Sequence, residues 1–198
     1  SELRLRGGLN GAASLVLDSS SNATFAGDII TTTAGTSNFR AGVNAGNSIT
    51  SGGNYNVTVG DEAGTAITTG DRNAIVGYAA GDALTEGGSN VSVGYLSLTA
   101  DTKGSRSVAV GDLALTSQNF TSATNALNTA VGYAAGYAVS TGTENTLIGA
   151  SAGVAVTTGV QNTLIGTYAG DALTDADHNT AVGRQALTTD TLGSRSTA

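Results

Sequence analysis

The 198-residue chain has no cysteine, proline, methionine or tryptophan, and only 12% of its residues are charged. Without cysteine it has neither a disulfide framework nor a thiolate metal site. Its eight lysines and arginines are dispersed, and its formal net charge is -7. A surface that binds nucleic acid needs clustered basic residues, so this class of partner is excluded. No apolar run reaches the length of a membrane span, which excludes membrane insertion by a helix.

What the chain has in quantity is glycine, with 29 residues, and small or β-branched aliphatic residues at regular intervals. Aligned on the glycine that follows valine or isoleucine, the sequence repeats every 17 residues, with one step of 21 between Gly111 and Gly132. A looser copy, NFRAGVNAG, places Gly42 before the first regular unit. Such a period is typical of a solenoid. The marker glycines are Gly60, Gly77, Gly94, Gly111, Gly132, Gly149, Gly166 and Gly183.

Three positions of the unit hardly vary. Position 1 is asparagine in all full units except the one that begins at Ser107, position 4 is always valine or isoleucine, and position 5 is the marker glycine. The asparagines are Asn56, Asn73, Asn90, Asn128, Asn145, Asn162 and Asn179. The position-4 residues are Val59, Val76, Val93, Val110, Val131, Ile148, Ile165 and Val182.

Each unit is expected to form one coil with two short strands and two turns, stacked on the next coil at about 4.8 Å. Stacked asparagines can pass amide hydrogen bonds from coil to coil. Glycine at position 5 suits a tight corner or a positive φ. Position 4 is expected to fill the interior, and alanine at position 8 keeps the walls close. One interior slot is filled from position 9 or position 12, never by an apolar side chain from both, as Gly64 with Ile67 and Leu98 with Asp101 illustrate.

The predicted fold is all-β: a parallel β-roll or β-solenoid of about nine coils over residues 38–198. The four extra residues of the longest unit predict an outward loop around 116–127. Residues 1–37 contain the short alternating strands LRLRG, ASLVLD and ATFAGDII and are expected to form a lead-in or N-terminal cap. The final SRSTA matches SRSVA at 105–109, so we expect the sequence to stop inside a coil.

A homotrimer is expected, because a 17-residue coil has too few apolar side chains for a stable lone solenoid. The small or apolar residues of position 3 are the candidates for the threefold axis. They are Thr58, Ile75, Ser92, Ala109, Ala130, Leu147, Leu164 and Ala181.

Candidate catalytic and metal residues are few. Gly149 to Gly153 fit the G-x-S-x-G turn that presents the nucleophile in many serine hydrolases, but the flanking glycines belong to the repeat and the sole histidine is His178. Ser151 is therefore interpreted as a surface serine, and no catalytic residue is expected. Asp175, Asp177 and His178 are interpreted as a solvated acidic turn rather than a metal site, so no metal or other cofactor is expected.

Four tyrosines near the corner glycine are the possible ligand contacts, since exposed tyrosines stack on sugars or contact proteins. The alternative, which we favour, is that they shield the corner. They are Tyr78, Tyr95 and Tyr133 at position 6 and Tyr168 at position 7.

The units NTAVGYAAG, NTLIGTYAG and NTAVGRQAL resemble the repeats of YadA-like heads of trimeric autotransporter adhesins, and they look still closer to repeats of phage and virus tail-fibre proteins. The resemblance covers residues 38–198 and implies a left-handed β-roll intertwined as a homotrimer. Units of YadA-like heads are usually shorter than those of this chain. Two function classes follow from the resemblance. The first is the structural shaft of a virion tail fibre, with other fibre or tail segments at both ends, that supports host attachment. The second is an adhesin head on a bacterial cell surface, in contact with matrix, glycan or protein.

Overall fold

The computed structural model describes residues 3–5, 15–17, 23–25 and 34–198. The chain divides into two compact units, residues 1–31 and residues 32–198. In the first unit, β1 (Leu3–Leu5), β2 (Leu15–Leu17) and β3 (Ala23–Phe25) form an antiparallel sheet in the order β1-β2-β3. These strands lie in the three segments where alternation predicted them.

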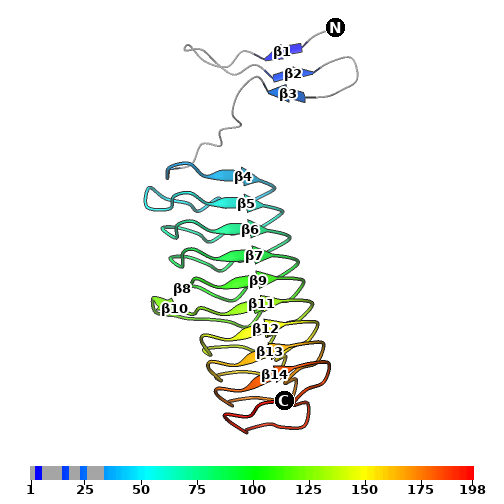
Figure 1. Ribbon diagram of the computed structural model, residues 1–198. Helices are drawn as coiled ribbons and strands as arrows, with labels where there is room; N and C mark the ends of the chain where they lie inside the picture. Colours follow the sequence, from blue (N-terminus) through cyan, green and yellow to red (C-terminus); the bar gives the residue numbers. More distant parts are fainter. Residues whose placement is uncertain (1–2, 6–14, 18–22, 26–33) are drawn as a thin grey trace. The chain divides into compact units, whose positions relative to one another are not determined.

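The second unit is a β-solenoid, as the period predicts (Figure 1). Nine short parallel strands stack in chain order, and each residue pairs with its equivalent in the next coil, as Leu147 does with Leu164. Eight steps of about 4.8 Å give a stack about 38 Å long. The strands are β4 (Phe39–Ala41), β5 (Val57–Val59), β6 (Ala74–Val76), β7 (Val91–Val93), β9 (Val108–Val110), β11 (Thr129–Val131), β12 (Thr146–Ile148), β13 (Thr163–Ile165) and β14 (Thr180–Val182).

The strand residues face the opposite way from the prediction. Position 3 points inward and is fully buried in every full unit, from Thr58 to Ala181. Position 4 points outward: Ile148 is 36% exposed and Val182 is 59% exposed. Because side chains alternate along a strand, one of the two neighbouring positions must lie outside. The assignments of position 4 to the interior and of position 3 to a threefold axis are therefore both wrong.

The rest of the core comes from positions 8, 9 and 12. Ala152 at position 8 and Val156 at position 12 have no exposed surface. The exchange between positions 9 and 12 is confirmed, since Leu98 at position 9 is buried like Ile67 at position 12. Asp101, at position 12 of the leucine-containing unit, is also buried, and it accepts hydrogen bonds from backbone amides.

Positions 3 and 9 also compensate for each other in size. Wherever position 9 is leucine, position 3 is serine or alanine; the three pairs are Ser92 with Leu98, Ala109 with Leu115 and Ala181 with Leu187. The larger position-3 residues face glycine. A Cβ on Gly153 would lie 2.8 Å from Leu147, and a Cβ on Gly170 would lie 2.7 Å from Leu164. One interior volume is thus filled from either side of the coil.

Each coil has one strand, not the expected two, apart from the short β8 and β10 described below. Positions 7, 9 and 17 adopt positive φ, as at Ser151 (55°), Gly153 (58°) and Gln161 (57°), and these left-handed residues turn the chain. Backbone hydrogen bonds nevertheless link the coils outside the strand: the Gly153 amide donates to Ala169, and the Thr157 amide donates to Thr174. The sides without strands are therefore also joined by coil-to-coil hydrogen bonds.

The asparagine ladder is present and buried. The Asn145 side-chain amide donates to the Gly159 carbonyl of its own coil (2.8 Å) and to Asn128 Oδ1 of the preceding coil (3.2 Å). The Asn145 backbone amide donates to the same Oδ1 at 2.9 Å. The asparagines from Asn56 to Asn162 thus close their own coils and tie them to the next. Asn38, in the looser first copy, belongs to the ladder as well, since the Asn56 amide donates to its side-chain oxygen.

In the unit that begins at Ser107, where serine replaces asparagine, a glutamine side chain completes the hydrogen bonds of the ladder. Gln118 Nε2 donates to Ser107 Oγ (3.0 Å), and Gln118 Oε1 accepts from Asn128 Nδ2 (2.8 Å). Gln118 also donates to the buried Asp101 carboxylate at 2.6 Å. A glutamine from the far side of the coil therefore supplies the amide group that Ser107 lacks.

The loop predicted around 116–127 is only partly an outward bulge. Phe120 is buried, whereas Thr121, Ser122 and Ala123 are exposed. The segment then returns as β10 (Thr124–Asn125), which pairs in parallel with β8 (Gly104–Ser105).

The corner glycines predict one sharp difference in stability. A Cβ on Gly149 would lie 2.6 Å from the Gly166 carbonyl carbon, whereas a Cβ on Gly183 would have no atom within 4 Å. Their φ angles, 132° and 134°, are nearly equal, so both alanine variants carry the same backbone strain of about 1–3 kcal/mol. Gly149→Ala is expected to cost about 1–3 kcal/mol more than Gly183→Ala. Urea unfolding of the two variants measures the difference, and equal losses would contradict the close approach of the coils.

Thr58 predicts a stabilising substitution. Its hydroxyl is buried and has no hydrogen-bond partner among the described residues. Thr58→Val keeps the shape and removes the orphaned polar group, so we expect the free energy of unfolding to rise by about 1 kcal/mol. Thr68→Val is the control, because the Thr68 hydroxyl donates to the Thr85 carbonyl at 3.2 Å and its loss should destabilise. A lower unfolding midpoint for Thr58→Val would disprove the prediction.

Candidate functional site

Ser151 has the surroundings of a turn residue. It lies at position 7 with φ 55°, and its backbone amide donates to Tyr133 of the preceding coil. Within the described part of the chain its hydroxyl makes no hydrogen bond, and His178 is an exposed turn residue of another coil. A nucleophile needs a base within hydrogen-bond reach, and among the residues with described positions no such base lies beside Ser151.

The acidic turn near His178 serves the stacking of coils. Asp175 accepts hydrogen bonds from the hydroxyls of Thr157 (2.6 Å) and Thr158 (2.9 Å), and these bonds lower the pKa of its carboxyl group. Asp177 accepts from the Val160 amide at 2.8 Å. No group of three or more histidine, aspartate or glutamate side chains that could hold a metal occurs among residues the structure describes.

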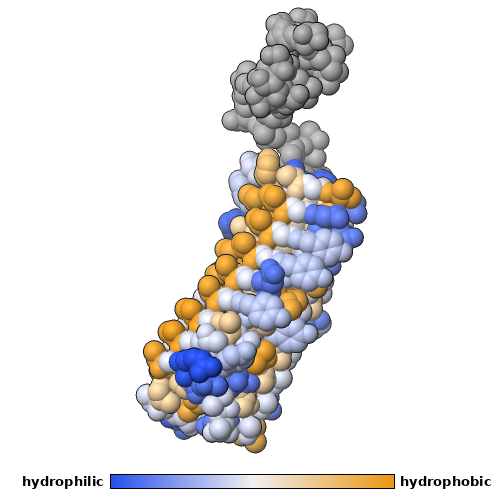
Figure 2. Space-filling model, turned by 90° about the vertical axis from the view of Figure 1, so that its right-hand side faces the viewer, coloured by the Kyte–Doolittle hydropathy of each residue, from blue (hydrophilic) through white to orange (hydrophobic). Residues whose placement is uncertain are grey.

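One extended surface feature of the solenoid is a column of β-branched aliphatic side chains at position 4, here called the aliphatic column. It runs along the solenoid as a continuous hydrophobic row, and the bare glycines of position 5 lie beside it (Figure 2). Its members lie on the outer face of the sheet and are half-buried or exposed. The most exposed are Val76, Val131, Ile148 and Val182.

Position 2 shares this outer face and is also uncharged. In full units it holds valine or alanine in the first half of the array and threonine in the second. Together, positions 2 and 4 make a sheet face without a single charged side chain from β5 to β14. Such a face can be covered by another surface without removing a charge from water.

The tyrosines lie outside the core. Tyr78 and Tyr95 stack on each other in successive coils, with ring centroids 5.6 Å apart and an interplanar angle of 14°. Asp112, the position-6 residue of the next coil, accepts a hydrogen bond from the Tyr95 amide. Tyr133 and Tyr168 are exposed, and so are Tyr55 and Tyr137, which the sequence pattern did not single out. The rings form no continuous ladder, because Asp112 and Ala150 interrupt position 6.

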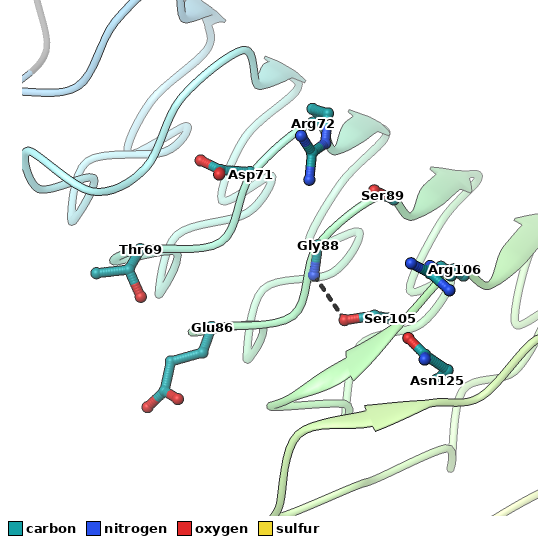
Figure 3. Close-up of a pocket in the computed structure, with 9 residues that line it drawn as sticks. All are labelled: Thr69, Asp71, Arg72, Glu86, Gly88, Ser89, Ser105, Arg106 and Asn125. Carbon is teal, nitrogen blue, oxygen red and sulfur yellow. Dashed lines mark hydrogen bonds between the residues drawn. The ribbon is translucent and has the colours of Figure 1, made fainter.

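A polar hollow was not anticipated from the sequence. It has a volume of about 240 Å³ and lies beside β8 and β10, where the longest unit breaks the period. Arg72, Ser89 and Arg106 line one side of it, and Asn125 of β10 contributes to its wall (Figure 3). One sequence feature could have indicated this hollow, because arginine, serine and arginine occupy position 17 of three successive units.

Comparison with known proteins adds no relative. No protein-family model, curated protein or solved structure matches the chain. In the described residues, no helix is long and apolar enough to cross a membrane.

Substitution of Ser151 tests whether it is only a turn residue. Ser151→Ala should change the free energy of unfolding by less than about 0.5 kcal/mol. Ser151→Gly should raise it by up to about 1 kcal/mol, because glycine adopts positive φ without strain. A fluorophosphonate probe for activated serines should leave the chain unlabelled. Mass spectrometry that finds the probe on Ser151 would overturn this interpretation.

Proposed function

We propose that the solenoid is a structural shaft segment of a trimeric viral tail fibre, which holds an attachment tip away from the particle. The resemblance of its units to tail-fibre repeats supports the proposal. So does a stack of coils whose buried side chains serve the stacking itself. The aliphatic column carries the proposal, since it is an apolar surface that runs the length of the stack.

In this proposal three chains pack through their sheet faces, with the aliphatic column at the shared axis. Large continuous apolar patches on soluble proteins commonly mark interaction sites. The column repeats at the same step as the coils, so a second copy in register meets it at every level. The glycines of position 5 have no side chains and let a neighbouring chain approach the corner closely. The trimer axis thus moves from position 3, where the sequence alone suggested it, to position 4.

An adhesin head is the second candidate function. The observation that favours it is the exposed pair of stacked tyrosines, Tyr78 and Tyr95, with Asp112 beside them. Aromatic rings next to carboxylates are suited to sugar binding. Glycan binding that Tyr78→Ala abolishes, in a chain that remains folded, would favour this candidate over the shaft.

The proposed axis predicts the effect of a charge at Ile148. Multi-angle light scattering of the unmodified chain should give about three times its mass of 19.3 kDa. Ile148→Asp should give monomers that keep their β-sheet circular dichroism, because Ile148 is exposed in the single chain but would bury an unpaired carboxylate in the trimer.

Two controls separate assembly from folding. Thr141→Asp places the same charge at an exposed site outside the aliphatic column and should leave the trimer intact. Leu147→Ala removes a fully buried side chain and should lower the free energy of unfolding by about 2–5 kcal/mol. The proposal is wrong if the unmodified chain is a monomer at micromolar concentration, or if Ile148→Asp remains trimeric.

A further inference from the structure

The period of the solenoid makes most of its surface repetitive, but the hollow beside β8 and β10 occurs at the one insertion. There the chain departs from its 17-residue step, β10 pairs with β8, and a buried polar cluster around Gln118 replaces the missing asparagine. The surface at this level therefore differs from that of the other coils. A ligand that binds here would recognise one place on the solenoid, not every coil.

One side of the hollow is formed by a gap between two arginine side chains, here called the notch. Arg72, Ser89 and Arg106 occupy position 17 of three successive coils, so the arginine Cα atoms are about 9.6 Å apart, two coil steps. All three residues have φ between 57° and 63°, and so leave the coil from the same backbone conformation. Serine is much shorter than arginine, so the middle residue leaves room between the two arginine side chains. Ser89 lies between the two guanidinium groups in Figure 3.

The positive charge of the notch is only partly offset by the two carboxylates of the hollow, Asp71 and Glu86. Within the described residues, neither the Arg72 nor the Arg106 guanidinium has a hydrogen bond or an ion pair. The two acidic residues of the hollow already have partners. Asp71 accepts from the backbone and side-chain amides of Asn54 (2.7 and 3.2 Å), and Glu86 pairs with Lys103 at 2.8 Å. By formal charge, Arg72, Arg106 and Lys103 outnumber Asp71 and Glu86 by one, so on a chain of net charge -7 the notch is a local anion-attracting site.

The residues that line the hollow also indicate which other chemical groups an anionic ligand would carry. Thr69, Ser89, Ser105 and Asn125 also line the hollow, and its lining residues include no aliphatic or aromatic side chain. Such a surface offers nothing to an apolar ligand, but it provides donors and acceptors for several ligand hydroxyls. Guanidinium groups bind carboxylate and phosphate through charge-assisted, often bidentate hydrogen bonds.

We propose that this hollow is a binding site for an acidic carbohydrate. The carboxylate or phosphate of the sugar lies in the notch between Arg72 and Arg106, and its hydroxyls bond to the neighbouring polar groups. Affinity for one such sugar is low because no aromatic ring stacks on it. The inference is independent of the proposed shaft, since a single chain carries the whole site.

The test uses the full chain and defined monosaccharides. Glucuronic acid and glucose 6-phosphate are titrated by NMR at low salt, with glucose and inorganic phosphate in parallel. An acidic sugar should bind with a dissociation constant on the order of 1 mM, and it should bind more tightly than glucose or inorganic phosphate does. The better of the two acidic sugars identifies the anion as carboxylate or phosphate. Arg72→Gln and Arg106→Gln should each weaken binding about tenfold.

Arg195→Gln is the matched control, because Arg195 occupies the same position 17 with φ 62° but has no second arginine two coils away. It removes the same charge from the same backbone conformation and should leave the affinity unchanged. Several results would overturn the proposal: no binding of either acidic sugar below 10 mM, equal binding of glucose or inorganic phosphate, or equal weakening by Arg195→Gln. Circular dichroism of each variant verifies its fold, and none of these results depends on the oligomeric state.

Discussion

The hydrogen bonds of the buried asparagines set the register on which the other columns depend. Each amide group bonds a carbonyl of its own coil and the backbone of the next, so two equivalent residues are held one strand spacing apart. With this contact fixed, the regular coils complete their circuit in 17 residues and the first coil, from Asn38 to Asn56, in 18, whereas the longest unit bulges outward after Phe120. The buried repair by Gln118 shows how strict the constraint is, because the loss of one amide at Ser107 is compensated by another amide from across the core.

Much of this architecture could be predicted from the sequence because it depends on local spacing. The period predicted parallel strands in register, and the invariant glycine predicted the corner with positive φ. Which strand position faces the core could not be predicted in the same way, because positions 3 and 4 are both largely apolar. Uniform valine at position 4 suggested a core, yet the varied position 3 is the buried one. The missed signal was covariation: position 3 is small whenever Leu98 or its equivalents at position 9 are large, and only residues that share a volume must compensate.

The candidate sites could be predicted less well, because they depend on surfaces that the period does not describe. Ser151 could be dismissed from its place in the repeat, since the glycines of its motif belong to the coil. The hollow near Arg106 could not be found, because it requires the path of the inserted residues back to β8. The exposure of the aliphatic column followed only after the inward position was known. Repetition therefore specifies the scaffold well and says little about where a partner would bind.

The stacking of equivalent residues also affects how such a molecule can evolve. Every coil presents its neighbours with the same ladder of amides and the same interior outline, so the upper face of one unit fits the lower face of almost any other. Duplication or deletion of a 17-residue stretch changes the length by one step of about 4.8 Å and leaves the remaining coils in contact. Length is therefore a property that recombination can adjust in single coils. The unit with the insertion is the exception, because its β10 and Gln118 fit only the neighbours they now have.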